Sequence, residues 1–474
     1  PNNFFAGNTA GVSAETIASS EPMGFAKAAG VTLQSMDETS STYAKVSNAQ
    51  ELEAALKKKS GIKTIEITQD IDLGYNTITA DGSTFTRIVE NNTPLTHPTL
   101  KKTGVSKVYI QDFTDGLTIY SKNGAKILHA GFNIKKCKNV VIQNIQFDEL
   151  WEWDENTKGN YDRNDWDYMT IENCNGVWVD HCTFGKAYDG VIDSKKGTNG
   201  LTISWCKFLD GDSSPEFFKA QFDELEANKS SNAMYKYLRD DIGLSQEQIM
   251  QVASPQKKTH LIGATELSAD NNELEATLCY NYYENSQDRM PRLRGGNVHA
   301  FNNIMDASGC YEAAKLISSD TSTKISSKGY HFGITSNGAI STESGAVLLE
   351  NCVIKGIKRP LGNNQKDASK TNYTGKIVAN NCYYEYGDTK FTGNSTDADS
   401  PLAPTPADDV AFSWNSTANL TGGKVPYDYS LYSLNEVETA VKAGAGVNAS
   451  TPIEPTDTTT TTVTTAETEP TTTT

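Results

Sequence analysis

The sequence predicts an all-β protein whose strands form a parallel β-helix. Seven short apolar segments recur through the middle of the chain, and each carries a polar or aromatic residue at the same position. The shortest steps between these marker residues run from Asn281 to Asn303 and from His181 to Trp205. Short strands that recur with a period of ~22 residues are typical of coils that stack on one another.

The marker residues predict a ladder along the outside of this stack. Each segment alternates apolar and other residues, as a strand does. Stacked coils place equivalent side chains ~4.8 Å apart, so we expect amide hydrogen bonds between the asparagines. The markers are Asn144, His181, Trp205, Asn281, Asn303, Asn351 and Asn381. We expect the residues after them to stack inside the helix: Ile145, Cys182, Cys206, Tyr282, Ile304, Cys352 and Cys382.

The eight cysteines, at positions 137, 174, 182, 206, 279, 310, 352 and 382, contain no Cys-x-x-Cys motif. A zinc or redox motif is therefore not expected. Four of the eight fall in the expected internal stack, which favours buried, small apolar side chains. A disulfide between two of them stays open as an alternative. His181 belongs to the marker row, which favours a structural role for it.

An N-terminal capping helix is expected within "SNAQELEAALKKK", residues 47–59. Ser47 and Gln50 have the spacing of a capping box. The open end of a stacked-coil protein exposes apolar side chains and needs a cover. We therefore expect this helix to close the N-terminal end of the β-helix.

A helical insertion is expected at about 213–256. Ser214 and Pro215 read as an N-cap followed by proline at the first helical position. Phe218, Phe222 and Leu225 follow at helical spacing. A second capping box, Ser245 with Gln248, predicts another helix in the same segment.

Composition limits the partners and suggests the domain organisation. The 474 residues include 59 acidic and 42 Lys or Arg side chains, a net charge of −17. So acidic a chain argues against nucleic acid, and it has no apolar run of the ~20 residues that span a membrane. We expect one β-helix domain over residues 1–450, acting as a monomer.

Residues 451–474, "TPIEPTDTTTTTVTTAETEPTTTT", predict an extended linker. Such Thr/Pro-rich linkers are typical of modular secreted enzymes. We therefore expect an extracellular protein in which the linker leads to a further C-terminal module, such as a dockerin or a carbohydrate-binding domain.

Four charged residues recur at one phase of the repeat. Asp167 precedes the marker His181, Asp189 and Asp193 precede Trp205, and Arg289 precedes Asn303, all by similar intervals along the chain. They occupy the same part of successive coils. The sequence therefore predicts that they line one outer face.

The acids among them suggest a metal site. In "DGVID", Asp189 and Asp193 would be ~13 Å apart on a straight strand, too far for one cation with ligands at ~2.4 Å. The stretch must bend, which Gly190 permits. Converging carboxylates of Asp167, Asp189 and Asp193 favour Ca²⁺ over Mg²⁺, and Asp165 could add a ligand. Ordinary solvated acids are the alternative.

Three arginines stand together in "QDRMPRLRGGNVHAFNN", residues 287–303. They are Arg289, Arg292 and Arg294. Guanidinium groups so placed commonly hold carboxylate or phosphate oxygens in a fixed geometry. Surface ion pairing with the surplus acids is the alternative interpretation.

Taken together, these motifs resemble a known family. "DWDYMTIENCNGVWVDHCTF", "DGVIDSKKGTNGLTISWCKF", "KTHLIGATEL" and "RMPRLRGGNVHAFNN" are similar to polysaccharide lyase family 1, the pectate lyases. The similarity covers roughly residues 24–385. It implies a right-handed parallel β-helix. It also implies Ca²⁺-dependent β-elimination of α-1,4-linked polygalacturonate, the backbone of pectin, to 4,5-unsaturated oligogalacturonides.

The same resemblance implies roles for individual residues. It makes Asp167, Asp189 and Asp193 the calcium ligands and Arg289 the catalytic base. Lys258 and Arg294 would bind substrate carboxylate and support catalysis, and Arg292 joins them in substrate binding. Asp180 in "WVDH" is taken as structural. The insertion departs from the short loop expected of the family, and because it ends just before Lys258 we expect it to border the cleft. Endo or exo action is left open.

Three other functions remain to be separated from this one. A pectin lyase shares the fold and the arginine but needs no Ca²⁺. The aromatic "LWEWD", with Trp151 and Trp153, would suit its neutral esterified substrate. A polygalacturonase would need paired acids for water attack and normally a GHG motif, which does not occur. A non-catalytic polysaccharide-binding β-helix is the third alternative.

Overall fold

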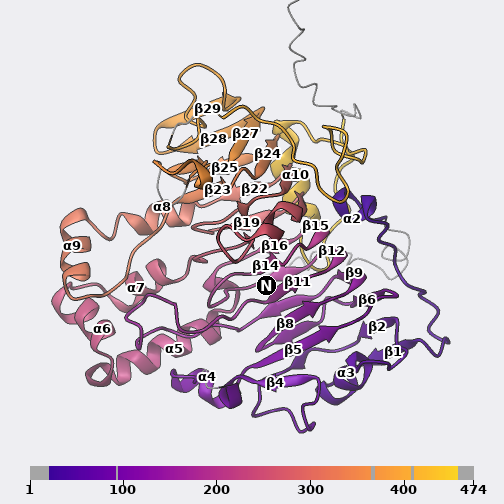
Figure 1. Cartoon of the computed structure of the whole chain (residues 1–474). Helices are drawn as coiled ribbons and strands as arrows, with labels where there is room; N and C mark the ends of the chain where they lie inside the picture. The colour runs from indigo at the N-terminus through magenta and orange to yellow at the C-terminus, as the bar shows by residue number, and fades with distance from the viewer. Residues whose placement is uncertain (1–20, 92–93, 365–368, 407–409, 457–474) are drawn as a thin grey trace, which may run out of the picture.

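The chain folds into a stack of coils, as predicted. The structure, a computed structural model, describes residues 21–91, 94–364, 369–406 and 410–456. Its strands form three long sheets, and successive coils contribute one strand to each sheet in turn. In Figure 1 the coils rise in order from the indigo and purple coils at the bottom to the orange coils at the top. The parallel β-helix is therefore confirmed, while residues 457–474 of the expected linker lie outside the described residues.

Three sheets, called A, B and C here, run the length of the stack. Sheet A contains, in spatial order, β1 (Tyr43–Val46), β2 (Thr64–Ile67), β6 (Leu117–Tyr120), β9 (Lys138–Gln143), β12 (Asn175–Asp180), β15 (Asn199–Ser204), β18 (Glu275–Cys279), β21 (Asn297–Phe301), β24 (Ala346–Glu350) and β27 (Lys376–Asn380). Sheet B contains β3 (Ile71–Asp72), β7 (Lys126–Leu128), β10 (Gln146–Asp148), β13 (Thr183–Phe184), β16 (Lys207–Phe208), β19 (Tyr282–Glu284), β22 (Ile304–Asp306), β25 (Val353–Lys355), β28 (Cys382–Tyr386) and β29 (Thr389–Gly393).

Sheet C carries the candidate site. It contains β4 (Phe85–Arg87), β5 (Ser106–Gln111), β8 (Ala130–Lys135), β11 (Met169–Glu172), β14 (Ile192–Lys195), β17 (Leu261–Ile262), β20 (Arg292–Arg294), β23 (Asn337–Thr342) and β26 (Arg359–Gly362). Neighbouring strands pair in parallel throughout the three sheets, except for β4 with β5 and β28 with β29 at the two ends.

The helices lie outside the stack. They are α2 (Gly24–Ala28), α3 (Ala49–Leu56), α4 (Pro98–Thr103), α5 (Pro215–Ala227), α6 (Ala233–Lys236), α7 (Gln246–Ala253), α8 (Ser308–Ala314), α9 (Ser319–Ser327) and α10 (Leu434–Gly444). Short 3-10 turns occupy Ile88–Asn91, Gly211–Ser213, Lys229–Ser231, Ala269–Glu273 and Thr371–Tyr373, and a π turn follows α6 at Tyr237–Asp241. In Figure 1, α4 to α9 project on one side, while α2 and α10 lie on the other.

The predicted marker row is right at five positions and wrong at two. Extending the sheet A register by one residue aligns Trp205 with Tyr280 and then with Asn302, not with Asn281 and Asn303. The complete outer row is Asn144, His181, Trp205, Tyr280, Asn302, Asn351 and Asn381. The inner row is then Ile145, Cys182, Cys206, Asn281, Asn303, Cys352 and Cys382, in place of the expected Tyr282 and Ile304.

The outer row marks the corner between sheets A and B. Every residue in it has positive φ, between 48° and 58°. Asparagine tolerates this left-handed conformation better than most residues, which explains why it recurs there. One amide ladder bond forms, from Asn381 Nδ2 to Asn351 Oδ1 at 3.0 Å. Elsewhere the row stacks rings: Trp205 lies 5.9 Å from His181 and 4.6 Å from Tyr280 between centroids.

The two asparagines of the inner row satisfy the backbone at the same corner. Asn281 Oδ1 accepts from the Cys206 N–H at 2.9 Å, and Asn303 Oδ1 accepts from the Asn281 N–H at 3.0 Å. Their Nδ2 groups donate to the carbonyls of Ile203 and Leu278. Because both ends of each buried amide are paired, these polar side chains fit inside the helix without an unsatisfied group.

The remaining core confirms the interpretation of the cysteines. All eight are buried and free. A stack of rings also runs through the interior, from Phe147 to Phe184, Phe208 and Tyr283, with centroid separations of 5.2, 5.2 and 4.7 Å. Identical coil spacing thus produces both an aromatic and a cysteine-rich row within one core.

The N-terminal capping helix is present, but its cap is one residue later than expected. The N-cap of α3 is Asn48, whose side chain accepts from the Glu51 N–H at 2.9 Å. Glu51 in turn accepts from the Ser47 N–H at 2.8 Å. Leu52 and Leu56 are buried against the first coils, so the covering role is confirmed while the Ser47–Gln50 capping box is wrong.

The insertion is helical, as expected, and both predicted starts are correct. Ser214 precedes Pro215 at the start of α5, and Ser245 with Gln248 forms the capping box of α7. Phe218, Phe222 and Leu225 are buried. Here α5 packs on the connection between β10 and β11, where the rings of Phe218 and Trp151 lie 5.2 Å apart.

A second helical segment, residues 307–336, was not predicted. It carries α8 and α9 and packs against the insertion, with the Tyr237 hydroxyl donating to the Lys324 carbonyl at 3.2 Å. Phe332 reaches the ring of Trp153 at 6.2 Å. The two segments therefore form one helical lobe beside the β-helix (Figure 1).

The C-terminal part of the chain returns along the corner of sheets A and B. Tyr432 accepts from Asn351 Nδ2 through its carbonyl at 3.0 Å, and the Asn448 N–H donates to Asn144 Oδ1 at 2.8 Å. Tyr432 also donates from its hydroxyl to the Ile453 carbonyl at 2.6 Å. The first residues assigned to the linker therefore contact the body of the protein. Within the described ranges no helix is long and apolar enough to cross a membrane.

A buried histidine ties the early coils together by charge. His129 is 3% exposed, and its Nδ1 lies 2.7 Å from Asp72 while its Nε2 lies 3.0 Å from Glu149. Burial opposes the charged imidazole, but the two carboxylates prevail and raise the pKa of His129 to about 9. In the unfolded chain the pKa of a histidine is ~6.5. Protonated His129 therefore contributes its full stabilisation below pH ~6.5. This contribution is lost as the pH rises through about 9.

We predict that replacing this histidine flattens the pH dependence of stability. A shift of this size is worth on the order of 3 kcal/mol. His129→Gln should lower the apparent Tm at pH 6 and reduce its decline between pH 6.5 and 9.5. Thermal unfolding followed by circular dichroism across that range measures this. The exposed His331→Gln is the control, and parallel pH profiles for wild type and His129→Gln would contradict the assignment.

Candidate active site

Three of the predicted metal ligands converge at the edge of sheet C. One carboxylate oxygen from each of Asp165, Asp167 and Asp189 lies within 4.8 Å of the others. The register explains this, because β11 pairs with β14 and the Asp189 N–H donates to the Trp166 carbonyl at 3.2 Å. Asp167 is 6% exposed, whereas Asp165 is exposed.

Asp193 borders this group without belonging to it. Its Oδ1 accepts a hydrogen bond from the Leu261 N–H at 2.8 Å. If residue 190 carried a Cβ, that atom would lie only 2.6 Å from Asp193 Oδ1. The Gly190 N–H in turn donates to Asp167 Oδ1 at 2.8 Å. The φ of Gly190 is not in the left-handed region, so glycine is needed here for space between the carboxylates rather than for a bend.

The clustered acids repel one another. Burial and the carboxylates of Asp193, Asp189 and Asp165 raise the pKa of Asp167 well above its usual value. Burial and the Asp189 carboxylate raise the pKa of Asp193 to about 7. Like charges held this close favour either protonation or a bound cation. The donor set is all oxygen, with no His or Cys, and fits Ca²⁺.

Lys258 is the cation in direct contact with the acids. Its Nζ donates to Asp189 Oδ1 at 2.7 Å, and both side chains are partly exposed. This contact joins the coil that contains β14 to the next coil, in which Lys258 stands just before β17. The predicted substrate-binding lysine therefore lies next to the predicted metal ligands.

Gln256, the last residue of the insertion, fixes both of these backbones. Its Oε1 accepts from the Ala187 N–H at 2.8 Å. Its Nε2 donates to the carbonyls of Asp189 at 2.8 Å and Lys258 at 2.9 Å. Gln256 is 2% exposed. No motif points to this residue, because a lone glutamine forms no pattern.

Arg289 lies on the next coil, beside the same acids. Three residues before the pair Leu261–Arg292 stand Lys258 and Arg289, so the register brings these two cations to one place. The positive charge of Arg289 acts on the carboxylates of both Asp189 and Asp193. The backbone of Arg289 has a φ of 64°, and its N–H donates to Asp288 Oδ1 at 2.9 Å. Predicted base and predicted ligands thus share one face.

Arg292 and Arg294 differ in their surroundings. Arg292 is partly exposed on β20, and burial with the neighbouring guanidinium groups of Arg294 and Arg289 lowers its pKa to about 10. Arg294 is 6% exposed. Its Nη1 donates to the Gly263 carbonyl at 2.6 Å and the Ala264 carbonyl at 3.1 Å.

Two acids that the sequence motifs do not single out complete the surroundings of Arg294. Its Nη2 lies 3.4 Å from Glu266 and its Nε lies 3.6 Å from Glu343. Of the two arginines, Arg292 is therefore the one with the more accessible guanidinium. The role of Arg294 toward substrate stays a prediction.

A group of lysines that no motif predicted lies on the same face. Lys135, Lys195 and Lys196 surround Glu172 with separations of 3.6, 3.6 and 3.4 Å. The pairs Lys135–Glu172 and Glu172–Lys195 are in register on β8, β11 and β14. Three positive charges around one negative charge leave this patch cationic, next to the acidic cluster.

The aromatic residues Trp151 and Trp153 do not face the site. Each is 2% exposed beneath the helical lobe. Gln221 of α5 clamps this stretch, donating to the Trp151 carbonyl and accepting from the Trp153 N–H, both at 2.9 Å. The expectation that this aromatic pair could serve a neutral substrate is wrong, because the rings form the packing between insertion and body.

Two other motif residues, Asp180 and His260, are buried and form hydrogen bonds within the protein. Asp180, on β12 of sheet A, is 1% exposed and accepts from Ser204 and Gln143 side chains at 2.7 and 2.9 Å. His260 is fully buried under the site and pairs with the Ile192 carbonyl and the Tyr283 hydroxyl. Burial lowers the pKa of His260 to about 4, so it is neutral.

A family model described as "Pectate lyase" matches residues 4–214 and 236–450. The gap between these matches, residues 215–235, covers α5 and most of α6. It is shorter than the expected insertion at 213–256, because the family model also matches residues 236–256. "Pectate lyase B" of Paenibacillus amylolyticus is 56% identical over 326 residues, covering 68% of this chain and 83% of that protein. A "Pectate trisaccharide-lyase" of Thermotoga maritima is 32% identical over 190 residues, covering 40% of this chain and 39% of that protein.

Solved structures agree. A pectate lyase from Paenibacillus sp. 0602 superimposes with a TM-score of 0.86 at 49% identity, covering 91% of this chain and 96% of that chain. A pectate lyase from Xanthomonas campestris shares the fold with a TM-score of 0.51 at 19% identity, covering 90% of this chain and 98% of that chain. Sequence and structure together establish that this chain belongs to the pectate lyase family.

Proposed function

We propose that this protein is a pectate lyase, which cleaves α-1,4-linked polygalacturonate by β-elimination to give 4,5-unsaturated oligogalacturonides. The observation that carries the proposal is the meeting of four acids with Lys258 and Arg289 at one edge of sheet C. Family membership supports the reaction type.

The charge of the substrate explains this arrangement. Polygalacturonate is a polyanion, and the protein itself has a net charge of −17. Binding therefore needs local cations that offset the repulsion. Lys258, Arg289 and Arg292 provide them on one face, and the neighbouring lysines around Glu172 extend the positive surface.

We infer that Asp165, Asp167 and Asp189 would hold Ca²⁺, with Asp193 beside them. Their oxygens, their proximity and their mutual repulsion suit a divalent cation. When bound, Ca²⁺ supplies positive charge that draws electron density from the C6 carboxylate and acidifies the C5 proton.

The side chains of this protein then perform the remaining tasks. Lys258 and Arg292 orient uronate carboxylates with charge-assisted hydrogen bonds. In its neutral guanidine form, Arg289 accepts the C5 proton as general base. The electron pair of the broken C5–H bond forms the C4–C5 double bond. The glycosidic oxygen leaves from C4 with the electron pair of the C4–O bond and takes up a proton to become a hydroxyl.

We also propose that the protein acts outside the cell. The support is compositional, since a Thr/Pro-rich linker is typical of modular secreted enzymes.

The first prediction from the proposed function concerns the reaction itself. Incubation with polygalacturonate should produce ultraviolet absorbance of the 4,5-unsaturated product, and EDTA should abolish it. Product that forms equally well with EDTA, with a preference for methyl-esterified substrate, would indicate a pectin lyase. New reducing ends without absorbance would indicate a hydrolase, and no cleavage at all would indicate a binding protein.

The second prediction tests Arg289. Arg289→Lys keeps a positive charge but shortens the side chain and removes the planar guanidinium. Loss of a general base typically costs ~10²–10⁴-fold in rate. We expect kcat to fall by about that factor with a modest change in KM, because Lys258 and Arg292 still bind carboxylates. Steady-state kinetics at saturating Ca²⁺ measures both, and a near-normal kcat would show that another group takes the proton.

The third prediction tests Gln256 as a positioning residue. Gln256→Met keeps the volume but removes the bonds to Ala187, Asp189 and Lys258. We expect the calorimetric Kd for Ca²⁺ to rise roughly tenfold, the effect of one to two lost hydrogen bonds. Gln221→Met is the matched control, because it is equally buried but clamps Trp151 and Trp153 instead.

Equal Kd values for the two glutamine variants would contradict the positioning role. A Kd that rises only for Gln256→Met, with similar Tm values for both proteins, would support it.

A further inference from the structure

We propose that Gln287 is a positioning residue for the catalytic arginine, and that the helical lobe acts on the reaction through it. This inference rests on the proposed function and extends it to a side chain outside the catalytic set. Gln287 stands two residues before Arg289 and is 3% exposed. Its hydrogen bonds lead to the two segments that carry the helices of the lobe.

All four polar groups of Gln287 are bonded to the ends of these segments. Two bonds reach the end of the insertion, where Nε2 donates to the Pro255 carbonyl at 3.2 Å and the N–H donates to the Gln256 carbonyl at 2.9 Å. Two bonds reach the segment that returns from α9 to β23. Here Oε1 accepts from the Thr335 N–H at 2.8 Å, and the carbonyl accepts from the Asn337 N–H at 2.9 Å. Gln287 therefore joins both halves of the lobe at the coil of the catalytic base.

The insertion side of this junction is anchored to the body of the protein. Lys186 is buried, and its Nζ donates to the same Pro255 carbonyl at 2.8 Å. This Nζ also lies 5.4 Å from the centre of the Trp151 ring, which packs under α5. One carbonyl thus accepts a charged donor from the β-helix and an amide donor from Gln287, so it holds the two coils together.

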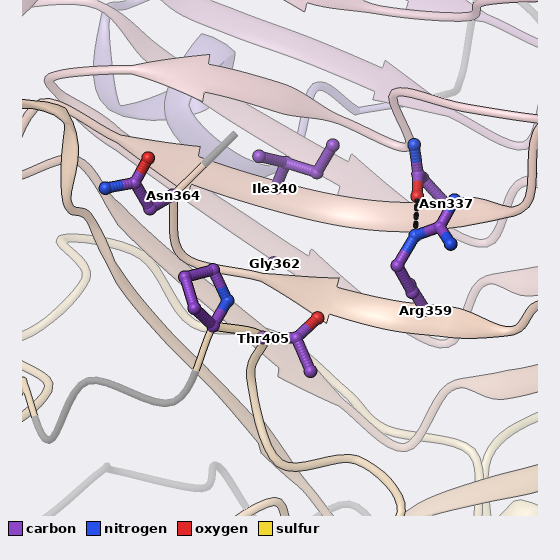
Figure 2. Close-up of a pocket in the computed structure, with 7 residues that line it drawn as sticks. Asn337, Ile340, Arg359, Gly362, Asn364 and Thr405 are labelled. Atoms are coloured by element: carbon purple, nitrogen blue, oxygen red, sulfur yellow. Dashed lines mark hydrogen bonds between the residues drawn. The ribbon is translucent and has the colours of Figure 1, made fainter. Parts of the chain in front are cut away.

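The return side of the junction is fixed as well. Figure 2 shows the Asn337 side chain directed toward Arg359 on the neighbouring strand, and Asn337 Oδ1 accepts from Arg359 Nε at 2.6 Å. The Asn337 side chain is also hydrogen-bonded to the Asp288 carboxylate. Asp288 in turn accepts from the Arg289 N–H at 2.9 Å. The segment that returns from the lobe therefore also holds the residue between Gln287 and Arg289.

The backbone of Arg289 needs this support. Its φ of 64° lies in the left-handed region, which a residue other than glycine adopts at a cost in free energy and keeps only where its surroundings hold it. On the far side, the Arg289 carbonyl accepts from the His260 N–H at 2.8 Å, and the Met290 N–H donates to the Gly338 carbonyl at 3.1 Å. On the near side, the bonds of Gln287 fix the chain. They thereby set the direction in which the guanidinium leaves the backbone.

The test starts from the kinetics of Gln287→Met, which keeps the length of the side chain but removes its bonds to Pro255 and Thr335. We expect kcat on polygalacturonate at saturating Ca²⁺ to fall roughly ten- to a hundredfold, since a catalytic group displaced by ~1 Å can cost that much. KM should change by less than about twofold, as for an interaction that matters mainly in the transition state. The calorimetric Kd for Ca²⁺ should also be retained, because Gln256 holds the backbone of Lys258 independently.

A double-mutant cycle separates positioning of Arg289 from a general loss of structure. Arg289→Ala removes the reacting group and leaves a residual rate. If Gln287 acts through Arg289, adding Gln287→Met to Arg289→Ala should lower that residual rate by less than about twofold, because residues that act as a unit are not additive. An equal fold loss in both backgrounds would overturn the proposal, and so would a near-normal kcat for Gln287→Met alone.

Two further variants control for folding and for the lobe as a whole. If Gln287→Met does not fold, Gln287→Asn supplies the same comparison, since its amide is one methylene too short for the two side-chain bonds. Gln221→Met, equally buried in the lobe, should leave kcat unchanged. A matching loss of kcat in Gln221→Met would show that loosening the lobe anywhere slows the reaction, which would overturn the role of Gln287. Failure of the proposed function is distinguishable, because the wild-type protein would then release no unsaturated product.

Discussion

The register between successive coils is the constraint on which every functional contact in this protein depends. Asp167, Lys258 and Arg289 are far apart in sequence, yet each stands at the same edge of sheet C on a neighbouring coil. The hydrogen bonds that hold the coils ~4.8 Å apart therefore also fix the spacing of the site. A slip of one residue would turn these side chains away from their common face.

Within that register, charge decides what the face can do. Burial and mutual repulsion make the cluster around Asp167 costly as free carboxylates. Lys258 relieves only part of this, through its contact with Asp189. The protein thus keeps a site that favours a cation, and it sets guanidinium groups on the following coils where a polyanion would lie. This combination reconciles an acidic protein with an acidic substrate.

The sequence carries the repeat and the site motifs because both depend on local patterns. Apolar alternation and the regular recurrence of short strands were enough to predict stacked coils, and the phase of Asp167, Asp189 and Arg289 was enough to place them on one face. The marker row failed at Asn281 and Asn303, because asparagine serves two purposes at adjacent positions. It accepts positive φ on the outer row and pairs with the backbone on the inner row.

Contacts between distant segments could not be predicted. Trp151 and Trp153 looked like exposed aromatics, but the helical lobe buries them. The surroundings of Arg294, with Glu266 and Glu343, arise from two loops far apart in sequence. Gln256 joins two coils through a single amide. None of these produces a periodic pattern, so each depends on tertiary packing.

The most direct test of this account is an anomalous diffraction measurement on crystals grown with Ca²⁺. We expect one strong peak at the edge of sheet C, within ~2.6 Å of carboxylate oxygens from Asp167 and Asp189, with Lys258 released from Asp189. That result would show that the register of the coils builds the metal site. A peak elsewhere would contradict the central claim. Crystals grown with Ca²⁺ that show no peak and an unchanged Lys258–Asp189 contact would contradict it as well.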